Sequence, residues 1–258
     1  MIGCIIQARM GSSRLPGKTL MKLDSSKTTL DFVIEQLSFS KLINRVVIAT
    51  TSLDEDNVIE EKARTLGIDC YRGSETDVLD RYYRCAKQFE MKTIVRITAD
   101  CPIIDPTIVD KVIEQFHNGD YDYATNTIFR TYPVGTDVEI FSFKSLEKSW
   151  YEAKLSSERE HVTPFLREKK SKFKIKNVEN AENMSHLRWT LDMNEDLILI
   201  RKIVSKMKKR PILMNDVIDL FSKEPELISI NEHIAKSCLL YTSPSPRDQR
   251  GSGMPACA

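Results

Sequence analysis

"IGCIIQARMGSSRLPGK", residues 2–18, is the stretch that decides the fold. It opens with a nearly unbroken apolar run over residues 2–8, which predicts a short strand buried on both faces of a sheet. A polar loop with two glycines, two serines, two arginines and a lysine follows directly. Because open α/β sheets hold ligands beyond the carboxyl ends of their parallel strands, this loop is predicted to face a ligand.

Strand-like and helix-like segments alternate through the first 119 residues. Buried strands are predicted at residues 2–8, 45–51, 68–71 and 93–99, and helices at 29–40, 55–67, 74–89 and 105–119. Ser74 is the expected N-cap of the third helix. The alternation predicts an α/β fold with a mixed, mainly parallel sheet and helices on both faces.

The rhythm changes in the second half of the chain. Strands are predicted at 121–126, 135–143 and 173–179, helices at 145–154 and 157–170, and a strand from residue 188 to an acidic turn, followed by a helix to 207. These segments add antiparallel strands and covering helices to the sheet. Since neither a repeat nor a convincing linker interrupts residues 1–236, we expect one domain there.

Residues 237–258, "SCLLYTSPSPRDQRGSGMPACA", differ from the rest in composition. They are rich in Ser, Pro and Gly and have neither a helical nor a strand period. The stretch "LLYTSPSPRD" resembles translated sequencing-adaptor read-through. We interpret this tail as non-native, in preference to a natural disordered tail, and exclude it from the fold.

Composition limits the partners. The 258 residues carry 38 Lys and Arg against 37 Asp and Glu, a net charge of +1. This balance argues against nucleic acid as a partner, so an anionic ligand needs a local cationic site. The chain has no apolar run long enough to span a membrane and no signal-peptide pattern at its start. Six scattered cysteines without a CxxC pair indicate thiols in a reducing cytoplasm, where we expect the protein to act.

The loop after the first strand has the chemistry of a triphosphate site. Glycines let its backbone turn and expose N–H groups, hydroxyls add donors, and the cations pair with phosphate oxygens. These residues are Arg9, Gly11, Ser12, Ser13, Arg14, Gly17 and Lys18. The spacing is one residue too long for a Walker A loop and does not fit GxGxxG. An ordinary polar surface loop is the alternative.

Six motifs together carry a family resemblance. They are "IIQARMGSSRLPGKTL" (5–20), "GSETDVLDRYYRCA" (73–86), "IVRITADCPIIDP" (94–106), "GTDVEIFS" (135–142), "SEREHVTPF" (157–165) and "RWTLDMNEDL" (188–197). In this order they resemble the cytidylyltransferase family that includes 3-deoxy-manno-octulosonate and acylneuraminate cytidylyltransferases, and within it the branch labelled spore-coat polysaccharide biosynthesis protein F. The resemblance covers roughly residues 1–236.

The resemblance implies a fold and a reaction. The fold is that of the nucleotide-diphosphosugar transferases, a GT-A-like Rossmann variant. The reaction is the Mg²⁺-dependent transfer of CMP from CTP to a sugar hydroxyl, with release of pyrophosphate, for surface polysaccharide. Family members are often dimers, so a homodimer is expected as a possible assembly. Cytosine selectivity is inherited from the family alone.

Two acids are the expected metal ligands. Asp100 follows a buried strand and Asp192 ends another, and the resemblance assigns both to Mg²⁺. With Arg14 and Lys18, which would stabilise the departing pyrophosphate, they form the expected catalytic set. The alternative for Asp100 is a turn or helix cap, and for Asp192 or Asn194 a cap of the following helix.

The nucleotide is expected to contact the cationic loop and two further segments. The resemblance places residues 73–86 by the nucleoside, and backbone groups near 49–51 bear on the base. The expected nucleotide-binding residues are Gln7, Ala8, Arg9, Gly11, Ser12, Ser13, Arg14, Lys18, Thr50, Asp77 and Arg81. The alternative for Asp77 and Arg81 is a simple ion pair along one helix face.

The sugar is expected to contact Asp137, Glu139, Arg159 and His161. Acids, an arginine and a histidine at the starts of a strand and a helix can line a sugar pocket, and His161 can act as the general base. A salt-linked surface helix is the alternative, and we prefer it for Glu158 and Glu160.

The sequence leaves two other function classes to be weighed. A glycosyltransferase that uses a ready-made nucleotide sugar shares this fold, and "DYD" at 120–122 is a weak candidate for its metal motif. A non-catalytic nucleotide-binding or scaffold protein would have lost the two acids, which are present.

Overall fold

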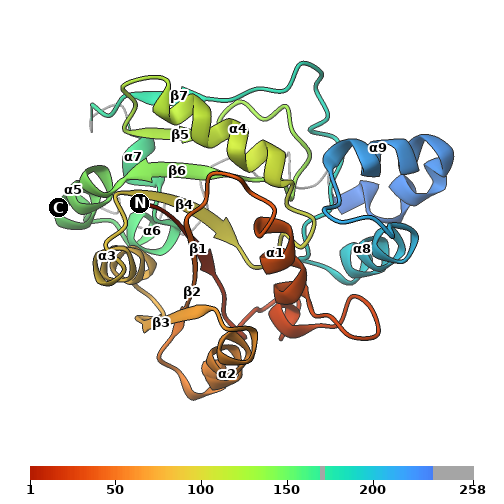
Figure 1. The fold of residues 1–258 in the computed structure, drawn as a ribbon, viewed down its shortest axis with the longest axis horizontal. Helices are drawn as coiled ribbons and strands as arrows, with labels where there is room; N and C mark the ends of the chain where they lie inside the picture. The colour runs from red at the N-terminus through yellow and green to blue at the C-terminus, as the bar shows by residue number, and fades with distance from the viewer. Residues whose placement is uncertain (169–171, 235–258) are drawn as a thin grey trace, which may run out of the picture.

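The computed structural model describes residues 1–168 and 172–234, and within them one seven-stranded sheet forms the centre of the molecule (Figure 1). The strands are β1 (Ile2–Gln7), β2 (Arg45–Thr51), β3 (Asp69–Gly73), β4 (Thr93–Thr98), β5 (Tyr123–Thr125), β6 (Glu139–Ser142) and β7 (Ile175–Asn177). Their order across the sheet is β3-β2-β1-β4-β6-β5-β7. The predicted α/β class is therefore confirmed.

The first four strands form the parallel half of the sheet. β1 pairs in parallel with β2 on one side and β4 on the other, and β3 extends the sheet beyond β2. Cys4, Ile5 and Ile6 of β1 have no exposed surface, because helices cover both faces of this central strand. The carboxyl ends of these strands meet at one edge, where the loop of residues 8–18 begins.

β6 reverses the direction of the sheet. It runs antiparallel to β4, with Glu139 opposite Arg96, and antiparallel to β5, which pairs in parallel with β7. The reversal puts the start of β6 beside the end of β4, since antiparallel neighbours join opposite ends. Residues 137–139 consequently lie at the same edge as the N-terminal loop.

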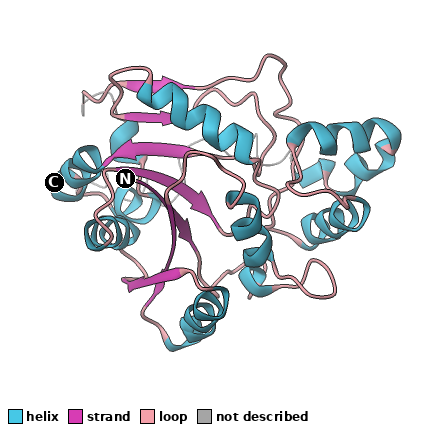
Figure 2. Ribbon diagram, viewed as in Figure 1, coloured by secondary structure: helices cyan, strands magenta, loops and turns pink. Residues whose placement is uncertain are grey.

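Helices cover both faces of the sheet (Figure 1, Figure 2). One face packs against α1 (Thr29–Leu37), α2 (Asn57–Leu66) and α4 (Pro106–His117). The other packs against α3 (Val78–Gln88), α5 (Phe143–Glu152) and α7 (Pro164–Arg167), and α6 (Ser156–His161) packs against α3 and α7. Alternate residues of β2 divide between the two cores: Ile48 packs on the first and Val47 on the second, as the two-residue period of a strand requires.

Helix ends follow the local sequence signals in most places. Asp105 caps α4 by accepting the N–H groups of Thr107 and Ile108, and Pro106 occupies the first turn, where its missing N–H costs nothing. Gly67 ends α2 with φ +67°. The expected cap at Ser74 is wrong, because α3 begins later and Asp77 caps it by accepting the N–H of Asp80.

A third core lies beside the sheet, at the right of Figure 1. It joins α8 (Asn194–Lys206), α9 (Met214–Lys223) and the short 3-10 helix η4 (Pro225–Ile230) to the N-terminal part of the chain. Leu15 and Leu23 from the N-terminal loops and Phe32 of α1 are buried there against Trp189 and Ile200. The loop that follows β1 is thus anchored to the C-terminal helices, which the sequence patterns did not indicate.

Two predicted elements differ in the structure. The strand expected from residue 188 is only an isolated bridge between Val134 and Arg188. The helix expected at 157–170 is divided into α6 and α7, because the backbone leaves the helical region at Val162, which has φ +71°, and Pro164, which has no N–H to donate, begins α7. The last two residues of that expected helix, 169 and 170, and the tail 237–258 lie outside the described residues.

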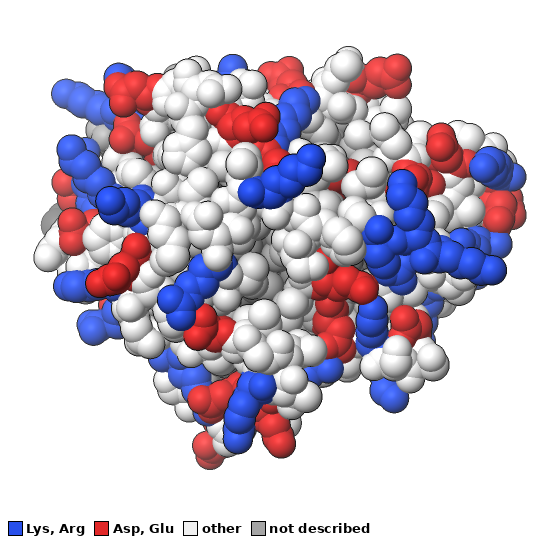
Figure 3. Space-filling view, viewed as in Figure 1, with Lys and Arg blue, Asp and Glu red and all other residues white. Residues whose placement is uncertain are grey.

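Charges of both signs are interspersed on the face seen in Figure 3, with a group of basic side chains over α8. This pattern agrees with the near-zero net charge of the chain. None of the helices within the described residues is long and apolar enough to cross a membrane.

Candidate active site

A cavity of about 340 Å³ lies at the carboxyl edge of the parallel strands. Its lining comes from the loop after β1, from the end of β4 and from one residue each of α6 and the segment before α8. The lining residues are Gln7, Arg9, Gly11, Ser12, Ser13, Arg14, Lys18, Thr19, Thr98, Ala99, Asp100, His161 and Asp192. We call this the cationic cavity. It contains seven of the predicted nucleotide-binding residues and all four predicted catalytic ones.

The loop around the cationic cavity is fixed by hydrogen bonds to its backbone groups, one of them with a distant side chain. Met10 N–H donates to Asp56 Oδ1 at 2.7 Å, and Gly17 N–H donates to the carbonyl of Met10 at 3.1 Å. The Thr19 hydroxyl donates to the carbonyl of Arg9 at 2.8 Å. Gly17 has φ +71°, a conformation that side chains disfavour, so this glycine is needed at the turn that presents Lys18.

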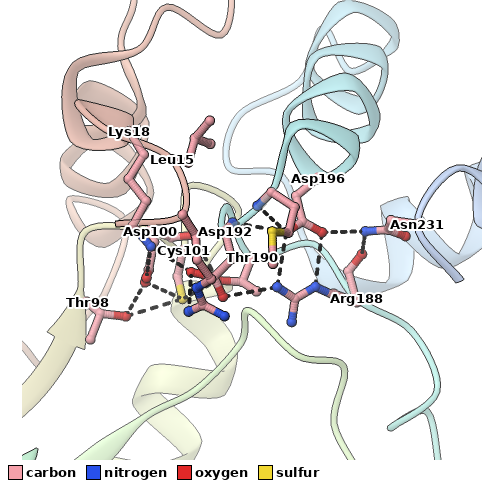
Figure 4. Close-up of polar contacts among 12 residues, drawn as sticks. Leu15, Lys18, Thr98, Asp100, Cys101, Arg188, Thr190, Asp192, Asp196 and Asn231 are labelled. Carbon is pink, nitrogen blue, oxygen red and sulfur yellow. Dashed lines mark hydrogen bonds and ion pairs between the residues drawn. The ribbon is translucent and has the colours of Figure 1, made fainter. Parts of the chain in front are cut away.

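Lys18 joins the two predicted acids (Figure 4). Its Nζ donates to Asp100 Oδ2 and to Asp192 Oδ1, each at 2.7 Å. Asp100 is held further by the Thr98 hydroxyl, which donates to Oδ1 at 2.5 Å. Arg14 Nη2 lies 3.3 Å from Asp192 Oδ1 and is half exposed to solvent. Lys18, Asp100 and Asp192, three of the four predicted catalytic residues, therefore meet at one point.

The electrostatics of this cluster favour the charged forms. Burial opposes charge on Asp192, but Lys18, Arg14 and Arg188 outweigh it and hold the pKa of that carboxyl below its ordinary value. Burial likewise opposes charge on Lys18, yet Asp100 and Asp192 raise the pKa of the ammonium. The carboxylate of Asp192 and the ammonium of Lys18 are therefore present together at neutral pH.

The helix-cap alternative for Asp192 and Asn194 is wrong. The carboxylate that accepts the N–H groups of Asp192 and Met193 belongs to Asp196. The side chain of Asp192 is left to contact Lys18 on one side and Arg188 on the other.

A second cavity, of about 610 Å³, adjoins the first and shares Thr98 and His161 with it. Its lining is Arg96, Thr98, Thr127, Arg130, Asp137, Glu139, His161, Thr163, Pro164 and Arg167. We call it the arginine cavity. Arg130 forms two hydrogen bonds with Asp137, at 2.5 and 2.8 Å, and Glu139 contacts both Arg96 and Arg167. Three of the four predicted sugar-binding residues lie here: Asp137, Glu139 and His161.

Arg159, the fourth predicted sugar residue, lies elsewhere. It lines a side cavity of about 420 Å³ with Arg9, Glu75, Thr76, Asp77, Lys154, Ser156 and Glu160. Arg159 forms two hydrogen bonds with Asp77 Oδ2, at 3.0 and 2.5 Å. Grouping it with the sugar residues is therefore wrong in geometry, because α6 points Arg159 and His161 toward different cavities. Arg9 lines both the side cavity and the cationic cavity.

Three of the predicted nucleotide-binding residues are buried away from the cavity linings described above. Ala8 belongs to the core, with its N–H donated to Ala49 O at 3.2 Å. Thr50 is fully buried. Arg81 is also fully buried and donates to the carbonyl of Ser74 at 2.9 Å, so it does not pair with Asp77 as the alternative held.

Glu158 is not the surface residue that its motif suggested. It is buried, and its Oε2 accepts the N–H groups of Lys154 at 2.8 Å and Leu155 at 2.9 Å, which caps the first turn of α6. Glu160 is exposed, as expected.

A model of the cytidylyltransferase family matches residues 3–239 of the chain. The protein belongs to the cytidylyltransferase family. Within the family it is 32% identical to the spore coat polysaccharide biosynthesis protein SpsF of Bacillus subtilis, over 88% of this chain and 97% of that protein. It is 36% identical to an uncharacterised protein of Methanocaldococcus jannaschii, over 89% of this chain and 94% of the relative.

Solved structures confirm the cytidylyltransferase fold. A cytidylyltransferase from Leptospira borgpetersenii superposes with a TM-score of 0.84 at 37% identity, covering 88% of this chain and 96% of that one. A CMP:2-keto-3-deoxy-manno-octonic acid synthetase complexed with CTP superposes with a TM-score of 0.63 at 17% identity, covering 80% and 98%. The second likeness concerns the fold alone.

Several residues of this family member were missed by the sequence patterns. Asp56 holds the loop at Met10, Arg130 and Arg167 line the arginine cavity, and Arg188 contacts Asp192. A signal existed for Arg188, which lies four residues before Asp192 in a quoted motif. No local pattern distinguished Asp56 or Arg167, because their partners are distant in sequence: 46 residues separate Met10 from Asp56, and 28 separate Arg167 from Glu139.

Proposed function

We propose that the protein transfers CMP from CTP to a sugar hydroxyl and releases pyrophosphate. The observation that supports this best is the convergence of Lys18, Asp100 and Asp192 on one wall of the cationic cavity, next to a second cavity large enough for an acceptor. The hydroxyl oxygen bonds to the α-phosphorus as the bond from that phosphorus to the bridging oxygen breaks. Pyrophosphate leaves, and the hydroxyl proton passes to a base.

The chain's cations act on the triphosphate. Arg9, Arg14 and Lys18 surround the space where the β- and γ-phosphates would lie, and they neutralise the charge that develops on the leaving pyrophosphate. Loop N–H groups and the hydroxyls of Ser12 and Ser13 add hydrogen-bond donors. We place the nucleoside toward the side cavity, since Arg9 lines both cavities.

Asp100 and Asp192 are the proposed Mg²⁺ ligands. Among the described residues, no group of three or more His, Cys, Asp or Glu gathers that could hold a metal by itself. Two carboxylates suit Mg²⁺, which keeps several waters and takes its remaining ligands from substrate phosphates. When bound, the ion would polarise phosphate oxygens and orient the triphosphate. Lys18 would then shift from the two acids toward the phosphates.

The acceptor is proposed to be a sugar that carries an acidic group. Three arginines and His161 line the arginine cavity against two carboxylates, and both carboxylates are already paired with arginine. An anion there would meet a positive excess. By its position between the two cavities, His161 is the proposed base for the hydroxyl.

Replacing His161 tests the acceptor side. His161→Ala should lower kcat/KM for the acceptor by about 100-fold or more, the contribution of a general base, and change the KM for CTP by less than about twofold. Steady-state kinetics with each substrate varied in turn separate the two effects. An unchanged kcat, or a rise in the KM for CTP as large as the rise in the KM for the acceptor, would contradict the role of His161 as the acceptor's base.

The reaction itself is tested by a pyrophosphate-release screen. CTP, UTP, GTP and ATP are each offered with acidic and amino sugars, with and without Mg²⁺. We expect release only with CTP, an acidic sugar and Mg²⁺ together, and a CMP-sugar by mass spectrometry. If none of the four triphosphates gave pyrophosphate release, the proposal would be refuted.

The glycosyltransferase alternative finds no support at its candidate motif. Asp120 is 95% exposed and pairs with Lys174, and neither it nor Asp122 lines the cationic cavity or the arginine cavity.

A further inference from the structure

A buried polar cluster stands behind Asp192, on the side away from the cationic cavity (Figure 4). It consists of Arg188, Asp196 and Asn231, which we call the Asp192 clamp. The side chain of Arg188 is 3% exposed and that of Asp196 is fully buried. Burial of an ion pair at this depth is costly unless every polar group finds partners, so its bonds need an account.

The central carboxylate of the clamp is fully used. Asp196 Oδ1 accepts from Arg188 Nε at 3.0 Å and from Asn231 Nδ2 at 2.8 Å. Oδ2 accepts from Arg188 Nη2 and from the N–H groups of Asp192 and Met193, each at 3.0 Å. The guanidinium is thus held in one plane by a paired bond that a lysine cannot reproduce.

One donor of Arg188 reaches past this pair to the active site. Nη2 also donates to Asp192 Oδ2 at 3.0 Å, while Asp192 Oδ1 faces Lys18 and Arg14. One oxygen of Asp192 is therefore held from behind and the other is presented to the cavity. Asn231 ties the cluster to the end of η4, since its Nδ2 also donates to the carbonyl of Arg188 at 3.2 Å.

We propose that Arg188, Asp196 and Asn231 are positioning residues that fix the carboxylate of Asp192 for the metal, and that the C-terminal segment thereby sets the geometry of the active site. The proposal rests on the proposed function for the role of Asp192. Asp196 accepts the Nε hydrogen and one Nη2 hydrogen of Arg188, and Nη2 also donates to the cavity carboxylate of Asp192, so one guanidinium joins the buried pair to the active site.

The test variant is Arg188→Lys, which keeps the charge and removes the planar fork. Keeping the charge matters, because deleting a cation 3.0 Å from Asp192 would by itself favour metal binding and mask a loss of geometry. Loss of a group that orients a metal ligand typically weakens metal affinity about 10–100-fold. Asn231→Ala, which changes no charge, should act in the same direction and more weakly.

The matched control is Gln36→Ala. Gln36 is buried, bonds to Ile104 and Ile212 through three hydrogen bonds and contacts no member of the clamp. It reports what a comparable loss of buried hydrogen bonds does to the fold alone.

Two readouts do not depend on turnover. Titration with Mn²⁺, followed by the electron paramagnetic resonance of the free ion, should give an affinity about 10–100-fold weaker for Arg188→Lys and within about twofold of wild type for Gln36→Ala. Hydrogen exchange of the peptide spanning 187–197 should speed up in Arg188→Lys and stay unchanged in Gln36→Ala.

A third readout uses turnover. In Arg188→Lys, the Mg²⁺ concentration for half-maximal rate should rise while the KM for CTP at saturating Mg²⁺ stays within about twofold of wild type.

The outcomes are distinct. Wild-type Mn²⁺ affinity in Arg188→Lys, or an equal loss in Gln36→Ala, overturns the positioning role. If the pyrophosphate screen finds no activity but Mn²⁺ binding and its dependence on Arg188 persist, the positioning role stands and the proposed reaction falls. A wild-type chain that binds no Mn²⁺ overturns the positioning role, whatever the screen shows.

Discussion

At the scale of single residues, Lys18 is the most informative side chain in the molecule. It lies 82 residues from Asp100 and 174 from Asp192 in sequence, and yet bonds to both at 2.7 Å. In the nucleotide-free chain its ammonium balances two acids that would otherwise repel each other. A triphosphate offers the same ammonium a more highly charged partner, which is why we expect Lys18 to serve both states.

Lys18→Met should lower turnover by about 100–1,000-fold, the usual cost of removing one charged group that stabilises a transition state. Arg14→Ala should act in the same direction. Far-UV circular dichroism should show an unchanged fold in both variants. Lys27→Met is the control, because Lys27 pairs with Glu35 outside the cavity linings described above. Near-normal turnover in Lys18→Met would contradict the assigned role.

We expect the free energy of unfolding to depend on pH through Glu139. Burial opposes its charge, but Arg96 and Arg167 lower the pKa of this carboxyl from 4.5 to about 2. Because the folded pKa lies below the unfolded one, this stabilisation is complete above about pH 5 and is lost as the pH falls toward 2; it amounts to about 3 kcal/mol. Urea unfolding of wild type and Glu139→Gln at pH 7, 5 and 3 should show their difference shrinking with acid. Parallel pH profiles would contradict this.

At the scale of elements, the segment before α8 depends on a close backbone contact. Gly135 has φ +106°, and a Cβ there would lie 2.7 Å from Thr190 N and 2.8 Å from Trp189 C. The neighbouring Val134 pairs with Arg188 in the isolated bridge. Because residue 135 has no side chain, the segment that leads into β6 can pack closely against residues 188–190, which precede Asp192.

Gly135→Ala should cost about 2–5 kcal/mol of unfolding free energy, from backbone strain and from the clash, and should lower turnover as Asp192 moves. Gly67→Ala is the matched control: its φ is +67°, but nothing lies within 4 Å of the added Cβ, so only about 1–2 kcal/mol is expected. Chemical unfolding and steady-state assays measure both. Equal losses in the two variants would exclude the contact with residues 189–190 as the cause.

At the scale of the whole molecule, the third core links the two ends of the described chain. Leu15 and Leu23 belong to the N-terminal loops, Ile200 and Val217 to the C-terminal helices, and Leu227 of η4 closes the cluster. The same core therefore anchors the cationic loop and the support of Asp192. We expect one cooperative unfolding transition for this reason.

Truncation tests the domain boundary. A chain that ends at residue 236 should keep the midpoint of unfolding and the turnover of the full chain, if the domain is 1–236 as proposed. A chain that ends at 224 loses Leu227 and Asn231, which are 2% and 3% exposed, and should lose about 2–5 kcal/mol together with most activity. Scanning calorimetry distinguishes the two. A destabilised 1–236 chain would place part of the fold in residues 237–258.

The sequence alone determined the strands of the parallel half, most helix positions and the loop chemistry. Period and composition are local properties, and residues 2–8, 45–51 and 93–99 carry them without help from distant partners. Only the tertiary structure decided that Arg159 belongs with Asp77, that Arg81 and Ala8 are buried, and that Arg188 holds Asp192. The reason is physical: such contacts depend on strand order, on the reversal at β6 and on the packing of the C-terminal helices, which bring together side chains that no spacing in the sequence relates.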